Sequence, residues 1–177
     1  MNHDRYSDQH ITSILDSVRT IAMVGASAVT NRPSYFAMKY LLGKGYEVIP
    51  VNPGLAGNEI LGKRVFAALA DLSGPIDMVD IFRNSAAALG IVRHAIRLRE
   101  RLAIKVIWMQ LGVRNDAAAA EAEAVGLQVV MNRCPKIEYG RLSGEIGWAG
   151  VNAGTISSKR PLLGARGLQN HIIAGKG

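Results

Sequence analysis

Five short apolar runs recur along the chain and are separated by stretches with helical periodicity. The runs cover residues 20–24, 47–51, 77–82, 105–109 and 128–131. Strands that alternate with helices are typical of parallel sheets, because each parallel crossover needs a long connection. The pattern therefore predicts an α/β fold, with a parallel sheet of about five strands, a helical stretch in each connection and helices on both faces.

The helical stretches are delimited by residues that favour helix ends. The first helix begins near Ser7 or Asp8 and precedes the first strand, with apolar positions 11, 14, 15 and 18 facing the sheet. Pro33 suits the opening of a helix through residue 42. Further helices are expected over about residues 85–101, with Ser85 as the cap, and over residues 117–125.

Length and composition predict one folded core. The chain has 177 residues, 49% of them apolar and 20% charged, which suits one domain and excludes a disordered chain. The lone Cys134 forms no internal disulfide, the first residues lack a secretory pattern, and no run approaches the ~18 apolar residues of a membrane span. We expect a cytoplasmic protein with no membrane partner.

The net charge of +7 is concentrated at one end of the chain. Residues 151–177 hold 4 of the 21 basic residues and none of the 14 acidic ones, so +4 of the +7 lies there. We therefore divide the chain into an amino-terminal helix (1–19), a central domain (20–142) and a basic arm (143–177). The arginine-rich stretch around His94 indicates a helix surface that faces solvent, so we do not expect a nucleic-acid partner.

The loop after the first strand has the chemistry of a phosphate-binding loop. Gly25-Ala26-Ser27 leads to Arg32-Pro33-Ser34 at the start of a helix. Backbone N–H groups and the helix dipole attract phosphates there, and Arg32, Ser27 and Ser34 add donors. A tight turn without any ligand is the competing interpretation.

An NAD site would lack its usual recognition groups. The glycine spacing is not G-x-G-x-x-G. The second strand ends in Asn52-Pro53, where an NAD enzyme has an acidic residue for the ribose.

Three other strand ends meet the same edge of the predicted sheet. Phe82-Arg83 offers a flat apolar face and a guanidinium, and Gln110 offers an amide after the core residues Trp108 and Met109. Each of these residues also has a purely structural interpretation. Cys134 lies near basic residues, but a lone cysteine is more often a small buried apolar residue.

Motifs of catalysis or metal binding are not readable in the chain. None of the four histidines, His3, His10, His94 and His171, lies at a predicted strand end. No zinc spacing, Walker A motif or Gly-x-Ser-x-Gly motif occurs. The sequence favours a ligand-binding module over an enzyme.

The strand-end residues as an ordered set resemble the small bacterial CoA-binding proteins, whose domain is similar to the CoA-binding domain of the succinyl-CoA synthetase α subunit. The matching stretches are Val24-Gly25-Ala26-Ser27, Arg32-Pro33-Ser34, and residues 45–53 (GYEVIPVNP), 60–62 (ILG), 80–83 (DIFR), 106–112 (VIWMQLG) and 133–136 (RCPK). They run in order from about residue 20 to residue 142. The resemblance implies a Rossmann-like, doubly wound domain.

The resemblance also implies the ligand, coenzyme A or an acyl-CoA. It implies that Gly25, Ala26, Ser27, Arg32 and Pro33 surround the phosphates. The nucleotide and pantetheine path is implied for Asn52, Pro53, Phe82, Arg83 and Gln110. The synthetase's catalytic histidine belongs to a following domain, so ligase activity is not implied.

Other functions stay open on the sequence alone. The alternatives are an NAD(P)- or other nucleotide-binding enzyme and an acyl carrier that uses Cys134. The apolar, glycine-rich tail with Ile146, Trp148 and Val151 has the composition to cover a neighbouring subunit, so we expect a homodimer.

Overall fold

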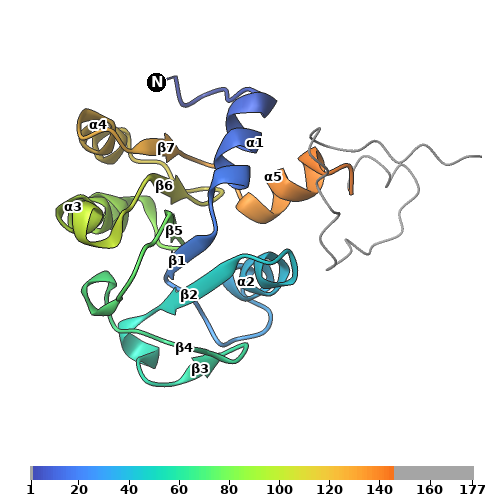
Figure 1. Cartoon of the computed structure of the whole chain (residues 1–177), viewed down its shortest axis with the longest axis vertical. Coiled ribbons are helices and arrows are strands. Elements are labelled where there is room, and N and C mark those ends of the chain that lie inside the picture. The colour runs from blue at the N-terminus through green and yellow to red at the C-terminus, as the bar shows by residue number, and fades with distance from the viewer. Residues whose placement is uncertain (1, 146–177) are drawn as a thin grey trace, which may run out of the picture.

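A five-stranded parallel sheet forms the centre of the molecule in a computed structural model that describes residues 2–145 (Figure 1). Its strands are β1 (Thr20–Val24), β2 (Glu47–Val51), β5 (Met78–Ile81), β6 (Val106–Met109) and β7 (Gln128–Val130). Their order is β2-β1-β5-β6-β7, and every pair is parallel. The expected α/β, Rossmann-like fold is confirmed. The chain leaves β1 toward β2 and returns to β5 on the other side, so the strand order reverses between β1 and β5.

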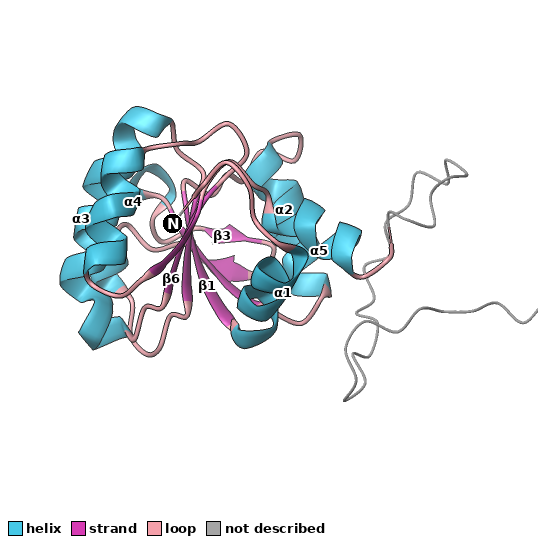
Figure 2. Ribbon diagram, turned by 90° about the horizontal axis from the view of Figure 1, so that it is seen from above, coloured by secondary structure: helices cyan, strands magenta, loops and turns pink. Residues whose placement is uncertain are grey.

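Helices cover both faces of the sheet, as the sequence predicts (Figure 2). The helices are α1 (Asp8–Ser17), α2 (Pro33–Gly43), α3 (Ser85–Leu102), α4 (Asp116–Ala124) and α5 (Pro135–Leu142). Helices α3 and α4 lie on one face, and α1, α2 and α5 lie on the other. Each face buries its own apolar core. The expected positions Ile11, Ile14, Leu15 and Val18 are all buried in the second of these cores.

Short side-chain caps explain where the helices begin. Ser7 accepts the His10 N–H at 3.2 Å, and Asn115 accepts the Ala118 N–H at 2.9 Å. For α3 the prediction of Ser85 as the cap was wrong, because the cap is the preceding residue, Asn84. Asn84 accepts the Ala87 N–H at 2.9 Å, because Ser85 is already helical. The Ser85 hydroxyl instead accepts the Arg114 N–H.

The connection from β2 to β5 departs from the predicted alternation, because it contains no α-helix. It consists of η1 (Pro53–Leu55), the hairpin of β3 (Glu59–Ile60) and β4 (Lys63–Arg64), and η2 (Leu69–Asp71). Gly57 and Gly62 have φ of 85° and 73°, and such turns interrupt a helix. Helix α5, in contrast, was not among the predicted helices.

A buried ion pair holds the end of the described chain against the domain. Lys44 is fully buried and pairs with the carboxylate of Glu145. The Tyr40 hydroxyl donates to the same carboxylate at 2.6 Å. The remainder of the predicted basic arm, including Ile146, Trp148 and Val151, lies outside the described residues.

Within residues 2–145, none of the helices has the length and apolar character needed to cross a bilayer.

Asp77 joins three segments just before β5. Its carboxylate accepts the backbone N–H groups of Arg19 and Thr20, at 2.9 and 3.1 Å, and the Lys105 amino group at 2.7 Å. Burial opposes ionisation, but these donors outweigh it and hold the pKa of Asp77 below its usual 3.8. The stability gained from this carboxylate is therefore complete above pH 3.8 and is lost as the pH falls below that value.

We expect Asp77→Asn to lower the free energy of unfolding at pH 7 by about 1.5–3 kcal/mol, the range for hydrogen bonds to a charged group. Urea denaturation of both proteins at several pH values measures the difference. The difference in unfolding free energy narrows as the pH falls below 3.8 and the carboxyl of the parent protein takes up its proton. Equal stability at pH 7 would contradict this role of Asp77.

Candidate functional site

The carboxyl ends of β1 and β5 come together without room for a side chain. The Gly25 N–H donates to the Val51 carbonyl at 2.9 Å, and the Phe82 N–H donates to the Val24 carbonyl at 2.8 Å. Gly25 has a φ of 89°, and a Cβ atom there would lie 2.4 Å from the Phe82 carbonyl oxygen. Glycine is therefore required at this position by the neighbouring strand as well as by the left-handed backbone.

Asn52 ties the loop after β2 to the loop after β1. Its Nδ2 donates to the Ala26 carbonyl at 2.8 Å, and its Oδ1 accepts the Gly54 N–H at 2.9 Å. Ser27 accepts the Val29 N–H at 3.2 Å within its own loop. The two loops thus form one braced edge beside the start of α2.

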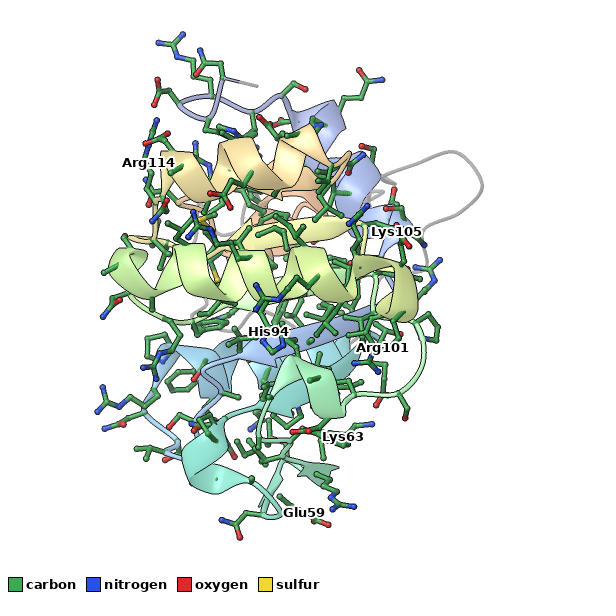
Figure 3. The ribbon with its side chains drawn as sticks, turned by 90° about the vertical axis from the view of Figure 1, so that its left-hand side faces the viewer. Glu59, Lys63, His94, Arg101, Lys105 and Arg114 are labelled. Carbon is green, nitrogen blue, oxygen red and sulfur yellow. The ribbon has the colours of Figure 1, made fainter. Side chains whose placement is uncertain are left out.

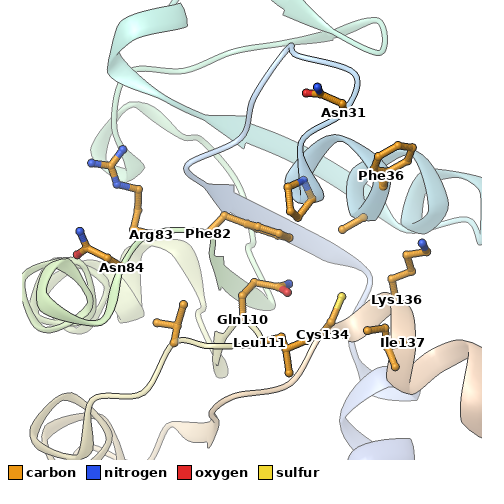
Figure 4. Close-up of a pocket in the computed structure, with 13 residues that line it drawn as sticks. Asn31, Phe36, Phe82, Arg83, Asn84, Gln110, Leu111, Cys134, Lys136 and Ile137 are labelled. Carbon is orange, nitrogen blue, oxygen red and sulfur yellow. The ribbon is translucent and has the colours of Figure 1, made fainter.

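Two cavities lie at this edge and share Arg83 in their walls. The larger, of about 750 Å³, is bounded by α2, the ends of β5 and β6, and α5 (Figure 4). The smaller, of about 300 Å³, lies beside the ends of β1 and β2 and the start of α3. Volumes of this size are usual for small-molecule sites.

The structure distributes the predicted site residues over both cavities. Pro33, Phe82, Arg83 and Gln110 line the larger cavity. Gly25, Asn52, Pro53 and Arg83 line the smaller one.

Three predicted residues line neither cavity: Ala26, Ser27 and Arg32. Arg32 is exposed at the amino end of α2, where its side chain makes no capping bond.

Both cavities suit an anionic ligand. Arg83 and Lys136 are the charged residues in the larger wall, and no Asp or Glu lines either cavity. The Lys136 amino group lies 6.0 Å from the ring centroid of Phe36 at the far end of the larger cavity. Among residues 2–145, no cluster of three His, Cys, Asp or Glu side chains is arranged to hold a metal ion.

Asp80 is a site residue that the sequence did not reveal. It is fully buried in β5, and both of its carboxylate oxygens accept from Gln110 Nε2, at 2.9 and 3.1 Å. Burial raises the pKa of Asp80 to about 7, although the Gln110 hydrogen bond acts in the opposite direction. Gln110 lines the larger cavity, and because its Nε2 donates to Asp80, its Oε1 is the part of the amide left to accept a hydrogen bond. The feature of the sequence that could have revealed Asp80 is a carboxyl group inside an otherwise apolar strand.

Cys134 lines the larger cavity but lacks the environment of an activated thiol. Burial raises the pKa of its thiol, and the charge of nearby Asp80 raises it further. The thiol is therefore protonated at neutral pH, which argues against the acyl-carrier alternative.

Two arginines of α3, Arg93 and Arg101, form hydrogen bonds within the protein; Figure 3 labels Arg101, together with His94 of the same helix. Arg93 makes two hydrogen bonds to Glu121, at 2.6 and 2.8 Å. Arg101 donates to the Leu72 and Ala70 carbonyls, both at 2.9 Å. His94 lines the smaller cavity, so this side chain is not only part of a solvated surface.

We expect stability to fall with rising pH because of Asp80. The unfolded carboxyl loses its proton near 3.8, whereas the folded one retains it to about pH 7. The free energy of unfolding therefore decreases between these values, by about 4 kcal/mol at 1.36 kcal/mol per pKa unit. Asp80→Asn removes this decrease, so the variant gains stability relative to the parent from pH 5 to pH 8.

Urea denaturation at unit pH steps measures this effect. Asp77→Asn is the matched control, because its stability difference from the parent protein stays constant above pH 3.8. A stability difference between Asp80→Asn and the parent that does not vary with pH would disprove the buried titration.

Comparison with known proteins agrees with the geometry. YneT of Bacillus subtilis (strain 168), an uncharacterized protein, is 33% identical over 133 residues, which span 75% of this chain and 94% of YneT. A hypothetical protein of Pyrococcus horikoshii OT3 superposes with a TM-score of 0.72 at 37% identity, over 78% of this chain and 94% of that one.

A dinucleotide-forming acetyl-coenzyme A synthetase of Ca. Korarchaeum cryptofilum shares the fold, with a TM-score of 0.53 at 20% identity, over 64% of this chain and 25% of that one. The family model described as a CoA binding domain matches residues 19–140. The chain therefore belongs to the CoA-binding domain family.

Proposed function

We propose that this protein binds coenzyme A across the edge formed by β1, β2, β5 and β6, and that it acts as a binding module. The observation that carries the proposal is the pair of acid-free cavities that meet at Arg83, beside the point where the strand order reverses. Ligands of open parallel sheets bind at this point. Membership of the CoA-binding domain family supports the same ligand.

The phosphates of the ligand are assigned to the junction of the cavities. The Gly25 loop approaches the start of α2, where backbone N–H groups and the helix dipole favour anions. Arg83 lines both cavities there, and its guanidinium forms charge-assisted hydrogen bonds with phosphate oxygens. Arg32, at the exposed start of α2, supplies a second positive charge.

The two ends of the ligand then differ in the groups that they meet. The adenine end is assigned to the smaller cavity, among Pro53, Leu69 and Ile91. The pantetheine arm is assigned to the larger cavity. There the Oε1 atom of Gln110 is suited to accept a hydrogen bond from an amide N–H of that arm.

The alternative of an NAD(P) enzyme is disfavoured by the end of β2. Asn52 stands where an acidic residue would bind the ribose, and both ends of its amide are occupied by Ala26 and Gly54. The predictions of a cytoplasmic location and of a homodimer remain part of this proposal.

We expect coenzyme A to stabilise the protein more than related nucleotides do. A ligand at 100 times its Kd adds about 2.7 kcal/mol to the free energy of unfolding. Thermal denaturation with coenzyme A, dephospho-CoA, ADP and NAD, each at the same concentration, ranks the ligands. A shift with NAD or ADP and none with coenzyme A would overturn the proposal.

We expect Arg83→Gln to weaken binding of coenzyme A by about 1.5–3 kcal/mol, because a charge-assisted contact to phosphate is lost. Isothermal titration calorimetry measures Kd for the parent and the variant. Arg97→Gln is the matched control, since Arg97 is an exposed arginine of α3 that lines neither cavity. Equal affinity of the Arg83 variant and the parent would remove Arg83 from the site.

A further inference from the structure

Three large apolar side chains are exposed around the larger cavity. Phe36, Leu111 and Ile137 have exposed fractions of 51%, 62% and 43%. They are three of the five large apolar residues that are exposed within residues 2–145. All three line the larger cavity, from α2, the loop after β6 and α5 (Figure 4). We call these three residues the apolar rim. Gathered apolar exposure of this kind marks a binding surface.

The larger cavity changes character from one end to the other. Arg83 and Asn84 lie at one end, and the apolar Phe36 and Ile137 lie at the other, with Lys136 beside them (Figure 4). Between them, Phe82 and Gln110 form the middle of the wall. A ligand that fills the cavity therefore needs an anionic or polar end, a middle part with hydrogen-bond donors, and an apolar end.

We propose that the ligand is a thioester of coenzyme A with an apolar acyl chain, and that the apolar rim contacts this chain. The inference rests on the proposed function, which assigns the phosphates to the Arg83 end of the cavity. The pantetheine arm then leads past Gln110 toward Cys134 and the rim. A free thiol there would leave the three apolar side chains in water, whereas an acyl chain buries them.

An acyl chain fits the rim better than a protein partner does, because the rim is continuous with the cavity. The same three side chains form part of the wall that holds Phe82, Gln110 and Cys134. The Cys134 thiol is protonated at neutral pH because burial raises its pKa, so it adds no charge beside the chain. Lys136 also lines this part of the cavity, and its amino group lies 6.0 Å from the ring centroids of both Phe36 and Tyr40.

The dependence of affinity on the length of the acyl chain tests this inference. Each fully buried methylene tightens binding about fourfold. Isothermal titration calorimetry compares coenzyme A, acetyl-CoA and hexanoyl-CoA with the purified parent protein. We expect hexanoyl-CoA to bind about tenfold or more tightly than acetyl-CoA, since part of its chain is covered by the rim.

Substitutions in the apolar rim test whether its side chains contact the acyl chain. In Leu111→Ser and Ile137→Ser we expect the ratio of hexanoyl-CoA to acetyl-CoA affinity to fall several-fold. Val125→Ser is the matched control, because Val125 is exposed on the far side of the sheet, after α4, and lines neither cavity. In Val125→Ser we expect the ratio of hexanoyl-CoA to acetyl-CoA affinity to equal that of the parent protein.

The outcomes separate this inference from the proposed function. If coenzyme A binds and chain length has no effect, the acyl inference fails and the proposed function stands. If none of the three ligands binds, the proposed function fails and the inference falls with it. If chain length has no effect and sedimentation velocity shows that Leu111→Ser converts a dimer to a monomer, the rim is an interface between copies of this chain and the inference is overturned.

Discussion

The close approach of β5 to Gly25 is the constraint on which the rest of the site depends. A side chain at position 25 would collide with the Phe82 carbonyl and with the Arg83 side chain. With glycine there, the turn after β1 stays beside the end of β5, and Arg83 enters the walls of two cavities at once. The turn is braced from the other side by Asn52, so the loops after three strands are held in one arrangement. A site whose supporting backbone is fixed in this way is preorganised for its ligand.

Asp77 lies just before β5 and Asp80 lies within it, and the two carboxyl groups play different roles. The Asp77 carboxylate accepts three hydrogen bonds, which keep it ionised, and it lies at the end of the sheet away from the site. Asp80 receives only the Gln110 amide and retains its proton to about pH 7. Its burial costs stability at neutral pH, and such a cost is characteristic of functional positions. In return, Asp80 holds the Gln110 amide in the wall of the larger cavity.

The distribution of charge agrees with a small anionic ligand more than with a nucleic acid. The cavities contain basic residues and no acidic ones. On α3, Arg93 and Arg101 are engaged by a carboxylate and by backbone carbonyls. The apolar rim lies at the end of the larger cavity away from Arg83, and this separation is the basis for assigning the proposed acyl chain to the rim.

The sequence by itself determined the five strands, four of the helices and the glycine turn after β1, because periodicity, caps and turn residues act over a few neighbouring positions. It misjudged the connection from β2 to β5, where glycine turns replace a helix. Only the tertiary structure decided the order of the strands, and with it which strand ends meet. The Asp80–Gln110 pair joins residues 30 positions apart, and the rim joins residues 36, 111 and 137. A local pattern records which face of an element is buried but not which distant element covers it, so these contacts appear only when the sheet is assembled.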